Sequence, residues 1–288
     1  MLKRVDRVQV VVGDNRATAT VFERLLGAEV VREDRVDLLA AQRVTLRLGA
    51  SEVEVIEPDG AGAAADFLSR TKGGLFAVGL ATADISRLRS HLQGRGVSLI
   101  EEEDQIFLSP EATGLPGLRA VISAEAERQP VGLVRCLYEA TLLVHDFASV
   151  VEKTAAGFAL EPSRFVPIRS EEFGYEGVLT LFHPERLDRI EIVTPNDAAK
   201  TMGRFFVRRG PGFYMCYAEA DDLTLIRERL LEYVPDDWTG PRDAGPTNIF
   251  IHPKALGGLM LGVSRTSVAW AWSGHPERVL ATPADEHA

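Results

Sequence analysis

The sequence is poor in cysteine and lacks long apolar runs, and both absences exclude classes of protein. Its two cysteines, Cys136 and Cys216, form no disulfide framework and lack the spacing of a zinc site. No apolar run approaches the roughly 18 residues that a membrane-spanning helix needs. The first residues enter a strand-like pattern without the apolar stretch of a signal peptide. We therefore expect a cytoplasmic protein with reduced cysteines and no membrane partner.

Positive charge is scarce relative to negative charge. The 32 Lys and Arg residues face 42 Asp and Glu residues, which gives a formal net charge of −10. Nucleic-acid phosphates reward basic protein faces, so this balance argues against a nucleic-acid partner. The length of 288 residues, of which 45% are apolar, suffices for two ordinary soluble domains.

One short phrase occurs twice in the chain. The run Val53–Pro58 (VEVIEP) returns as Ile190–Pro195 (IEIVTP), so Glu54 and Glu191 occupy matching places in β-branched, strand-like segments. A carboxylate in such a run is costly to bury unless a partner pairs with it, protonates it or coordinates it. The phrase indicates two duplicated modules, each with an acidic group aimed into a pocket.

The apolar pattern divides into four similar units of strand, helix and three strands. The leading strands are expected at 5–12, 76–81, 137–144 and 213–219, and the helices at 16–26, 85–93, 147–156 and 223–233. A pair of such units curls its strands around a shared cavity and covers them with helices. This pattern predicts an α+β fold of two tandem modules, 1–123 and 137–281, with a polar linker at 124–136 and a tail at 282–288.

Three stretches resemble the vicinal oxygen chelate superfamily, which includes glyoxalase I, methylmalonyl-CoA epimerase, fosfomycin- and bleomycin-resistance proteins and extradiol dioxygenases. They are the strand Val5–Asp14 with the helix end Phe22–Ala28, the segment Gly74–Val78, and the loop His252–Gly258. The resemblance implies two modules of βαβββ units around cavities. It indicates a fold more than a reaction, because the superfamily supports many chemistries.

The resemblance also implies four metal-ligand positions in each module, usually His, Gln or Glu. In the first module they fall on Arg7, Glu54, Ala77 and near Val121. A guanidinium is a permanent cation and repels a metal. We therefore expect Arg7 and Glu54 to form a structural charge pair where the metal would have been.

In the second module the same positions fall on Glu139, Glu191, Met215 and Gly262, with Tyr214 replacing Met215 if the register slips by one residue. This set contains no imidazole, so we expect no cofactor. If a divalent metal does bind, Glu139 and Glu191 are its expected ligands.

Proton chemistry is the other use of Glu139 and Glu191. Two facing carboxylates in a dry cavity shift their two pKa values apart, so one can be protonated while the other is ionised. Such a pair suits proton abstraction next to a carbonyl. Tyr214 or His252 would then replace the metal as the donor that stabilises an enolate. The alternative is that the carboxylates are solvated, or paired with Arg189 or another arginine.

Further residues are candidates for substrate binding. Phe213, Met215 and Tyr217 share one strand face by period-two alternation and would form an apolar wall, unless they are ordinary core. Lys254, next to His252, would bind a carboxylate or coenzyme A phosphates, unless it is solvated.

A basic cluster interrupts the acidic sequence at Lys200, Arg204, Arg208 and Arg209. If helical, it presents an anion-binding patch with Arg204 at its centre, a subunit contact, or a solvated face. The alternating Trp270 and Trp272 are predicted to extend a strand or cover a subunit contact, so a homodimer stays open.

We interpret the chain as an isomerase, epimerase or lyase that abstracts a proton from a small carbonyl or acyl-thioester substrate in the C-terminal cavity. The alternative is a metal-free protein that binds or sequesters a small molecule. An extradiol-type dioxygenase or a metal-dependent glyoxalase ranks lower, because neither module supplies two histidines at its ligand positions.

Overall fold

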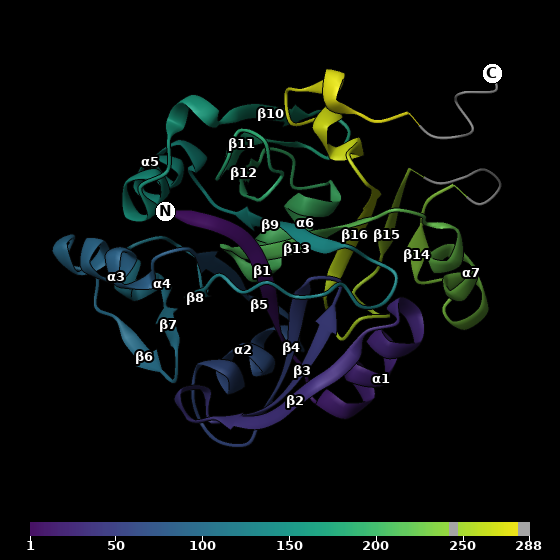
Figure 1. The fold of residues 1–288 in the computed structure, drawn as a ribbon, viewed down its shortest axis with the longest axis horizontal. Coiled ribbons are helices and arrows are strands. Elements are labelled where there is room, and N and C mark those ends of the chain that lie inside the picture. The colour runs from purple at the N-terminus through teal and green to yellow at the C-terminus, as the bar shows by residue number, and fades with distance from the viewer. Residues whose placement is uncertain (242–246, 282–288) are drawn as a thin grey trace.

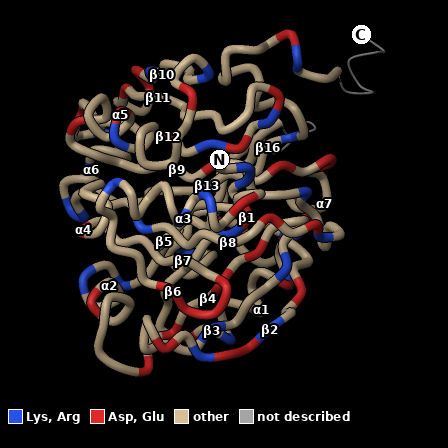
Figure 2. Tube along the Cα trace, turned by 60° about the vertical axis from the view of Figure 1, so that its left-hand side comes forward, with Lys and Arg blue, Asp and Glu red and all other residues tan. Residues whose placement is uncertain are grey.

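The computed structural model describes residues 1–241 and 247–281, and these form two eight-stranded sheets (Figure 1). The α+β class and the two tandem modules of curled sheets with helices outside are therefore confirmed. Among the described residues, no helix has the length and apolar character needed to cross a bilayer. Acidic and basic segments are interspersed over both halves of the molecule (Figure 2).

The first sheet contains the strands β1 (Leu2–Val11), β2 (Glu29–Val36), β3 (Ala41–Leu48), β4 (Ser51–Pro58), β5 (Gly74–Thr82), β6 (Ile100–Glu102), β7 (Gln105–Leu108) and β8 (Ala120–Ala124). Their order across the sheet is β2-β3-β4-β1-β5-β8-β7-β6. The helices of this module are α1 (Asn15–Leu26), α2 (Ala63–Thr71), α3 (Ile85–Gly94) and α4 (Pro110–Thr113), and a 3₁₀ helix η1 spans Asp37–Leu39.

The second sheet contains β9 (Cys136–Leu143), β10 (Val166–Ser170), β11 (Tyr175–Leu181), β12 (Arg189–Pro195), β13 (Gly212–Ala220), β14 (Trp238–Thr239), β15 (Asn248–Ile251) and β16 (Met260–Arg265). Its order, β10-β11-β12-β9-β13-β16-β15-β14, repeats that of the first sheet. The helices are α5 (Phe147–Phe158), α6 (Thr201–Arg209) and α7 (Thr224–Tyr233), and the 3₁₀ helices are η2 (Pro162–Arg164), η3 (Val268–Ala271) and η4 (Pro276–Arg278).

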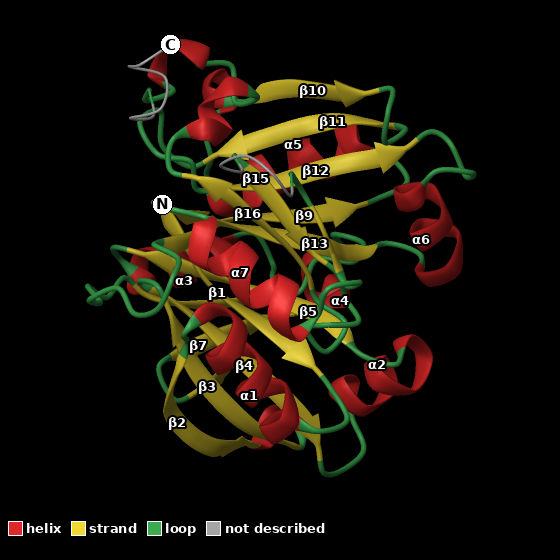
Figure 3. Cartoon of the chain, turned by 90° about the vertical axis from the view of Figure 1, so that its right-hand side faces the viewer, coloured by secondary structure: helices red, strands yellow, loops and turns green. Residues whose placement is uncertain are grey.

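Helix α1 illustrates how local sequence forms these elements. Asp14 caps the helix by accepting a hydrogen bond from the Ala17 amide at 2.8 Å. Phe22 and Leu25 are buried on its inner face, and Gly27 ends it at a left-handed φ of 67°. The helix packs beside α7 of the other module, and α3 packs beside α5 (Figure 3). One large apolar core runs between the outer helices and the convex sides of both sheets.

Two helices were absent from the sequence prediction and close matching ends of the concave faces. Helix α2 packs on β4 and β5 with Phe67 against Phe76, and α6 packs on β12 and β13 with Phe205 against Tyr214. Each has only nine residues. Such short segments carry too little periodicity to stand out in a sequence.

The predicted final strand around Trp270 is wrong. This segment forms the short helix η3, and Trp270 packs with Tyr138, Leu179 and Leu181 on the concave side of the second sheet. The alternation of Trp and Ala is too short to distinguish a strand from one helical turn. The predicted tail, 282–288, lies outside the described residues.

The segment predicted as a linker, 124–136, is bonded along the first module. The Gly49 amide donates to Val131 O at 2.8 Å, and the Ala50 amide donates to Arg135 O at 2.6 Å. Arg128 forms ion pairs with Asp6 at 3.1 Å and with Glu52 at 3.2 Å. The segment therefore supplies a cation to Asp6 and Glu52, two acidic residues of the first sheet.

Gly49 allows this close approach, and its substitution should measure what the contact contributes. Its φ is +61°, and an added Cβ would lie 2.3 Å from Arg135 O. We expect Gly49→Ala to lower the free energy of unfolding by about 2–4 kcal/mol, because strain and overlap add. Urea unfolding followed by circular dichroism measures this change.

Gly114→Ala is the matched control. Gly114 has a similar φ of +64°, with nothing within 4 Å of an added Cβ. Gly114→Ala should lower the free energy of unfolding by roughly 1 kcal/mol, the cost of placing alanine at a positive φ. Equal losses in the two variants would contradict the steric role of Gly49.

Candidate functional site

The candidate site lies on the concave face of the second sheet, where Glu139 on β9 and Glu191 on β12 come together. Both side chains are almost fully buried, with 1% and 6% exposure. The parallel register places Glu191 opposite Thr141 and places Glu139 opposite Arg189. All four side chains therefore belong to one polar patch within an otherwise apolar sheet face.

Arg189 holds Glu139 in place. The Arg189 Nε donates to Glu139 Oε2 at 2.6 Å, and Nη1 donates to Leu187 O at 3.1 Å. The guanidinium is fully buried and stacks over the Tyr138 ring, 4.9 Å from its centroid. Glu139 is thus the ion-paired carboxylate of the two, as one of the sequence interpretations expected.

Glu191 has a hydroxyl as its hydrogen-bond partner instead of a cation. The Thr141 hydroxyl donates to Glu191 Oε2 at 2.5 Å, and it lies 3.5 Å from Glu139 Oε1. Burial, and then the negative charge of Glu139, raise the pKa of Glu191 to about 8. The two carboxyl groups are therefore unlike: Glu139 is paired with a guanidinium, and Glu191 retains a proton near neutral pH.

Aromatic side chains flank the pair. The Tyr217 ring lies 5.9 Å from that of Tyr138, 5.8 Å from Phe250 and 6.4 Å from Trp272. It covers Gly262, where an added Cβ would lie 2.2 Å from the ring. On the other flank, burial and then the charge of Glu191 raise the pKa of Tyr175, so its phenol is a neutral donor.

Only two of the three residues predicted to form an apolar wall lie beside the carboxyl pair. Met215 lies opposite Thr141 and Tyr217 lies opposite Glu139, so both border the carboxyl pair. Phe213 instead belongs to the core on the opposite face of the sheet. A register shift between Phe213 and Met215 breaks the period-two alternation on which the prediction depended.

Four other predicted residues lie away from the pair. The Tyr214 ring packs 5.0 Å from Phe205 of α6. His252 lies in the loop after β15, where its Nε2 is 3.3 Å from the Thr239 hydroxyl. The Lys254 side chain is 80% exposed and pairs with Asp237 at 3.2 Å. Arg204 is exposed on α6 and bonds Ala199 O and the Thr201 hydroxyl.

The first module shows the same position in a neutralised form. Glu54 is fully buried and accepts hydrogen bonds from Arg7 and Gln9, both at 2.8 Å. Arg43 adds a third contact at 3.4 Å. Burial acts to raise the pKa of Glu54, but the charges of Arg7 and Arg43 lower it overall. The structure thus contains the Arg7–Glu54 ion pair that the sequence analysis expected.

The strand registers place a further polar residue beside each buried glutamate. Gln9 lies opposite Glu54, and Thr141 lies opposite Glu191. Each lies two residues along its strand from the residue expected at the first ligand position, Arg7 or Glu139, and shares its sheet face.

The donors at these positions do not fit a divalent metal. The second module offers the carboxyl groups of Glu139 and Glu191 and the Met215 thioether, and Glu139 is already paired with the Arg189 cation. In the first module the arginines already neutralise Glu54. Within residues 1–241 and 247–281, no group of three or more His, Cys, Asp or Glu side chains is placed to hold a metal ion. We therefore derive no step through a metal.

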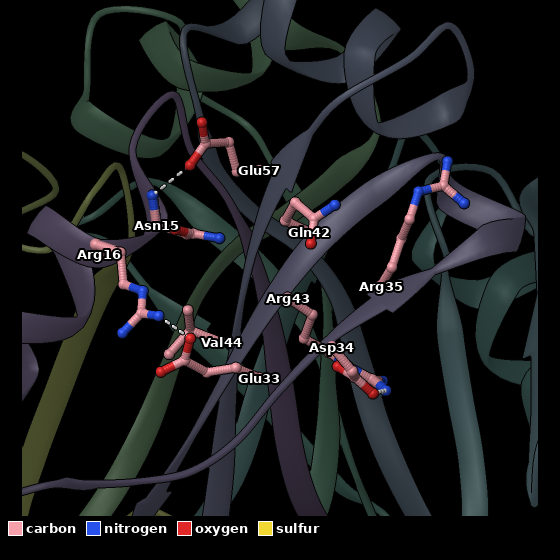
Figure 4. Close-up of a pocket in the computed structure, with 9 residues that line it drawn as sticks. All are labelled: Asn15, Arg16, Glu33, Asp34, Arg35, Gln42, Arg43, Val44 and Glu57. Carbon is pink, nitrogen blue, oxygen red and sulfur yellow. Dashed lines mark hydrogen bonds and ion pairs between the residues drawn. The ribbon is translucent and has the colours of Figure 1, made fainter.

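Two pockets lie away from this pair. One, of about 420 Å³, is at the start of α1 and is lined by Asn15, Arg16, Glu33, Asp34, Arg35, Gln42, Arg43, Val44 and Glu57 (Figure 4). Arg16 pairs there with Glu33, and the Asn15 amide donates to Glu57 at 3.0 Å. The other, of about 480 Å³, lies between the start of α3 and the end of α5.

Comparisons with known proteins show which family model and which solved structures the chain is similar to. Residues 6–107 match the family model described as Glyoxalase/Bleomycin resistance protein/Dioxygenase superfamily. No curated protein matches the sequence. A mutant of 4-hydroxymandelate synthase from Streptomyces coelicolor is similar with a TM-score of 0.67 and 13% identity, over 100% of this chain and 99% of that chain.

Two further solved structures are similar. A xylose isomerase-like TIM barrel/4-hydroxyphenylpyruvate dioxygenase fusion protein has a TM-score of 0.63 and 10% identity, over 95% of this chain and 52% of that chain. Methylmalonyl-CoA epimerase from Mycobacterium tuberculosis has a TM-score of 0.39 and 22% identity, over 48% of this chain and 93% of that chain.

The family match lies within the first module, and the similarity to 4-hydroxymandelate synthase spans both modules. At such low identity the structural similarity establishes the fold and not the reaction. The family match thus covers residues 6–107, and the chain as a whole has the fold of two tandem modules that it shares with 4-hydroxymandelate synthase.

Proposed function

We propose that the second module is an enzyme site that transfers a proton at a carbon next to a carbonyl group, with Glu191 as the acid/base residue. The observation that carries this proposal is a buried carboxyl group held by one hydroxyl, with its pKa raised to about 8. Both protonation states of such a group are accessible near neutral pH, as general acid/base catalysis requires.

Glu139 has a different part in this proposal from the one expected from the sequence. Its Oε2 accepts the 2.6 Å hydrogen bond from Arg189, so it is a positioning residue. Its negative charge raises the pKa of Glu191, and its ion pair with Arg189 fixes its position. A single acid/base group suits transfer between two atoms on one face of a substrate, as in an isomerase.

The phenols of Tyr175 and Tyr217 are the proposed donors to the enolate oxygen, in place of Tyr214 or His252. Burial raises the pKa of both, and the charges of Glu139 and Glu191 add to the effect. Tyr217 lies opposite Glu139, Tyr175 lies on β11 within reach of the charge of Glu191, and both phenols stay protonated at neutral pH. Neutral donors in a dry site stabilise developing negative charge effectively.

The proposed substrate is a small carbonyl compound without phosphate groups. A coenzyme A thioester needs cations for its phosphates, and the expected Lys254 is 80% exposed and paired with Asp237. The second candidate function is binding without turnover, which the unsuitable metal-ligand positions of both modules favour.

Hydrogen exchange tests the proposed reaction. In D₂O, the wild-type protein should exchange the C–H next to the carbonyl in one or more members of a panel of small ketones and hydroxyketones, followed by proton NMR. Glu191→Gln should slow this exchange by about 10²–10⁴-fold, because the amide cannot take the proton.

Glu176→Gln is the matched control, since Glu176 is exposed on β11 of the same sheet. It should exchange at the wild-type rate. Equal rates in wild type and Glu191→Gln would reject Glu191 as the acid/base residue, and no exchange with any ketone would leave the binding function as the better candidate.

The raised pKa of Glu191 also predicts how stability depends on pH. Because the folded state holds this proton more tightly than the unfolded chain does, wild-type stability should fall as pH rises from about 4.5 toward 8. Glu191→Gln removes this term, so it should gain stability over wild type by up to a few kcal/mol across that window. Urea unfolding at pH 5, 7 and 8.5 measures the difference, and parallel pH curves would show that Glu191 titrates normally.

A further inference from the structure

We propose that the concave face of the second module binds a ligand carrying a positive charge, an ammonium or guanidinium group placed beside Glu191. This inference rests on the proposed function only in taking this face as the active one. It comes from comparing the two modules position by position, because their sheets have the same strand order.

In the first module two cations reach the buried glutamate. Arg7 approaches Glu54 from β1 at 2.8 Å, and Arg43 approaches it from β3 at 3.4 Å. Gln9 completes the set with a hydrogen bond to the other carboxylate oxygen at 2.8 Å. The charge of Glu54 is therefore fully compensated from within the chain.

Both cations are lost at the equivalent places of the second module. Arg7 lies opposite Glu52, and the corresponding pair is Glu139 opposite Arg189, with the two charges exchanged. Arg43 lies opposite Ile56, and the corresponding residue opposite Val193 is Gly177. An added Cβ at Gly177 would lie 2.2 Å from Ile192 O, so this position cannot supply a side chain.

Arg189, the cation beside the carboxyl pair, already forms an ion pair with Glu139. Arg189 bonds Glu139 at 2.6 Å, and among the described residues no Arg or Lys forms an ion pair with Glu191. Glu219, also on this side of β13, is a third carboxyl group near Arg189, and its pKa is raised by burial. Arg135 and the Ser267 amide also act on Glu219, whereas Glu191 has no ion-pair partner among the described residues.

The side chains around Glu191 suit a cation. Tyr175 and Tyr217 lie near enough for the charge of Glu191 to raise their pKa values, and the Tyr217 ring packs with Phe250 and Trp272. Aromatic faces attract ammonium and guanidinium groups, most strongly when water is excluded. A ligand cation would here take the place that Arg43 has beside Glu54.

Binding of a cation also prepares the proposed chemistry. Positive charge beside Glu191 favours its ionised form, so the ligand would displace the resting proton and leave a carboxylate. The released proton goes to solvent. The ligand would thereby convert the acid form of the site into the base that proton abstraction needs.

Three probes of similar size and different charge test the proposal: benzylamine, benzyl alcohol and benzoate. Titration calorimetry at pH 7 should show benzylamine binding at least tenfold more tightly than benzyl alcohol, and benzoate binding weakest. Repeating the titration in buffers of different ionisation enthalpy should reveal release of nearly one proton per benzylamine. Below the pKa of Glu191, benzylamine affinity should rise by up to about tenfold per pH unit, since the cation binds the deprotonated form.

Glu191→Gln should abolish both the preference for benzylamine and the proton release, whereas Glu176→Gln, which removes an exposed charge from β11, should preserve both. Benzoate binding as tightly as benzylamine, benzylamine binding without proton release, or no binding of any probe at millimolar concentration would overturn the proposal. Because calorimetry does not depend on turnover, this result is separate from the exchange assay: cation binding without C–H exchange would reject the reaction alone.

Discussion

The cost of burying a carboxylate within a sheet is the constraint on which both modules depend. Each concave face carries one glutamate at the same position, and the two modules compensate the cost of burying it in different ways. Around Glu54 the chain provides two arginines and an amide, and the result is a closed ionic network. Around Glu191 it provides a hydroxyl and a second carboxylate, and the proton becomes the counter-charge. The same backbone thus carries one glutamate closed in by ion pairs and one whose pKa is raised to about 8.

Much of the fold follows from apolar periodicity in the sequence. The helices α1, α3, α5 and α7 lie within a few residues of their predicted places, because each is long and has one buried face. The strands that lead each unit also lie near their predicted places, because they are runs of mostly apolar residues. The short helices α2 and α6 escaped prediction, and so did the register shift that turns Phe213 into the core. Such features depend on packing between elements, and the apolar periodicity of a single segment carries no information about that packing.

The sequence predicted the carboxyl pair and, as one alternative, its pairing with Arg189, but not the hydrogen bond from Thr141 to Glu191. Glu139 and Glu191 could be brought together because each lies in a strand that the repeat aligns. The role of Arg189 depends on a cross-strand neighbour, and the choice between Thr141 and Glu139 as the residue opposite Glu191 depends on a shift of two residues. His252 and Lys254 show the converse error, since a loop resemblance does not fix the distance to the site.

The ion pairs of the connecting segment have a consequence for how the protein can be divided. Arg128 neutralises Asp6 and Glu52, and Val131 and Arg135 accept hydrogen bonds from the turn at Gly49 and Ala50. A fragment cut before this segment would leave Asp6 and Glu52 with Arg7 but without Arg128, and a glycine turn without its partner strand. The Arg135 amide also donates to Glu219 O of the second module, so the segment joins the two modules by hydrogen bonds as well as covalently.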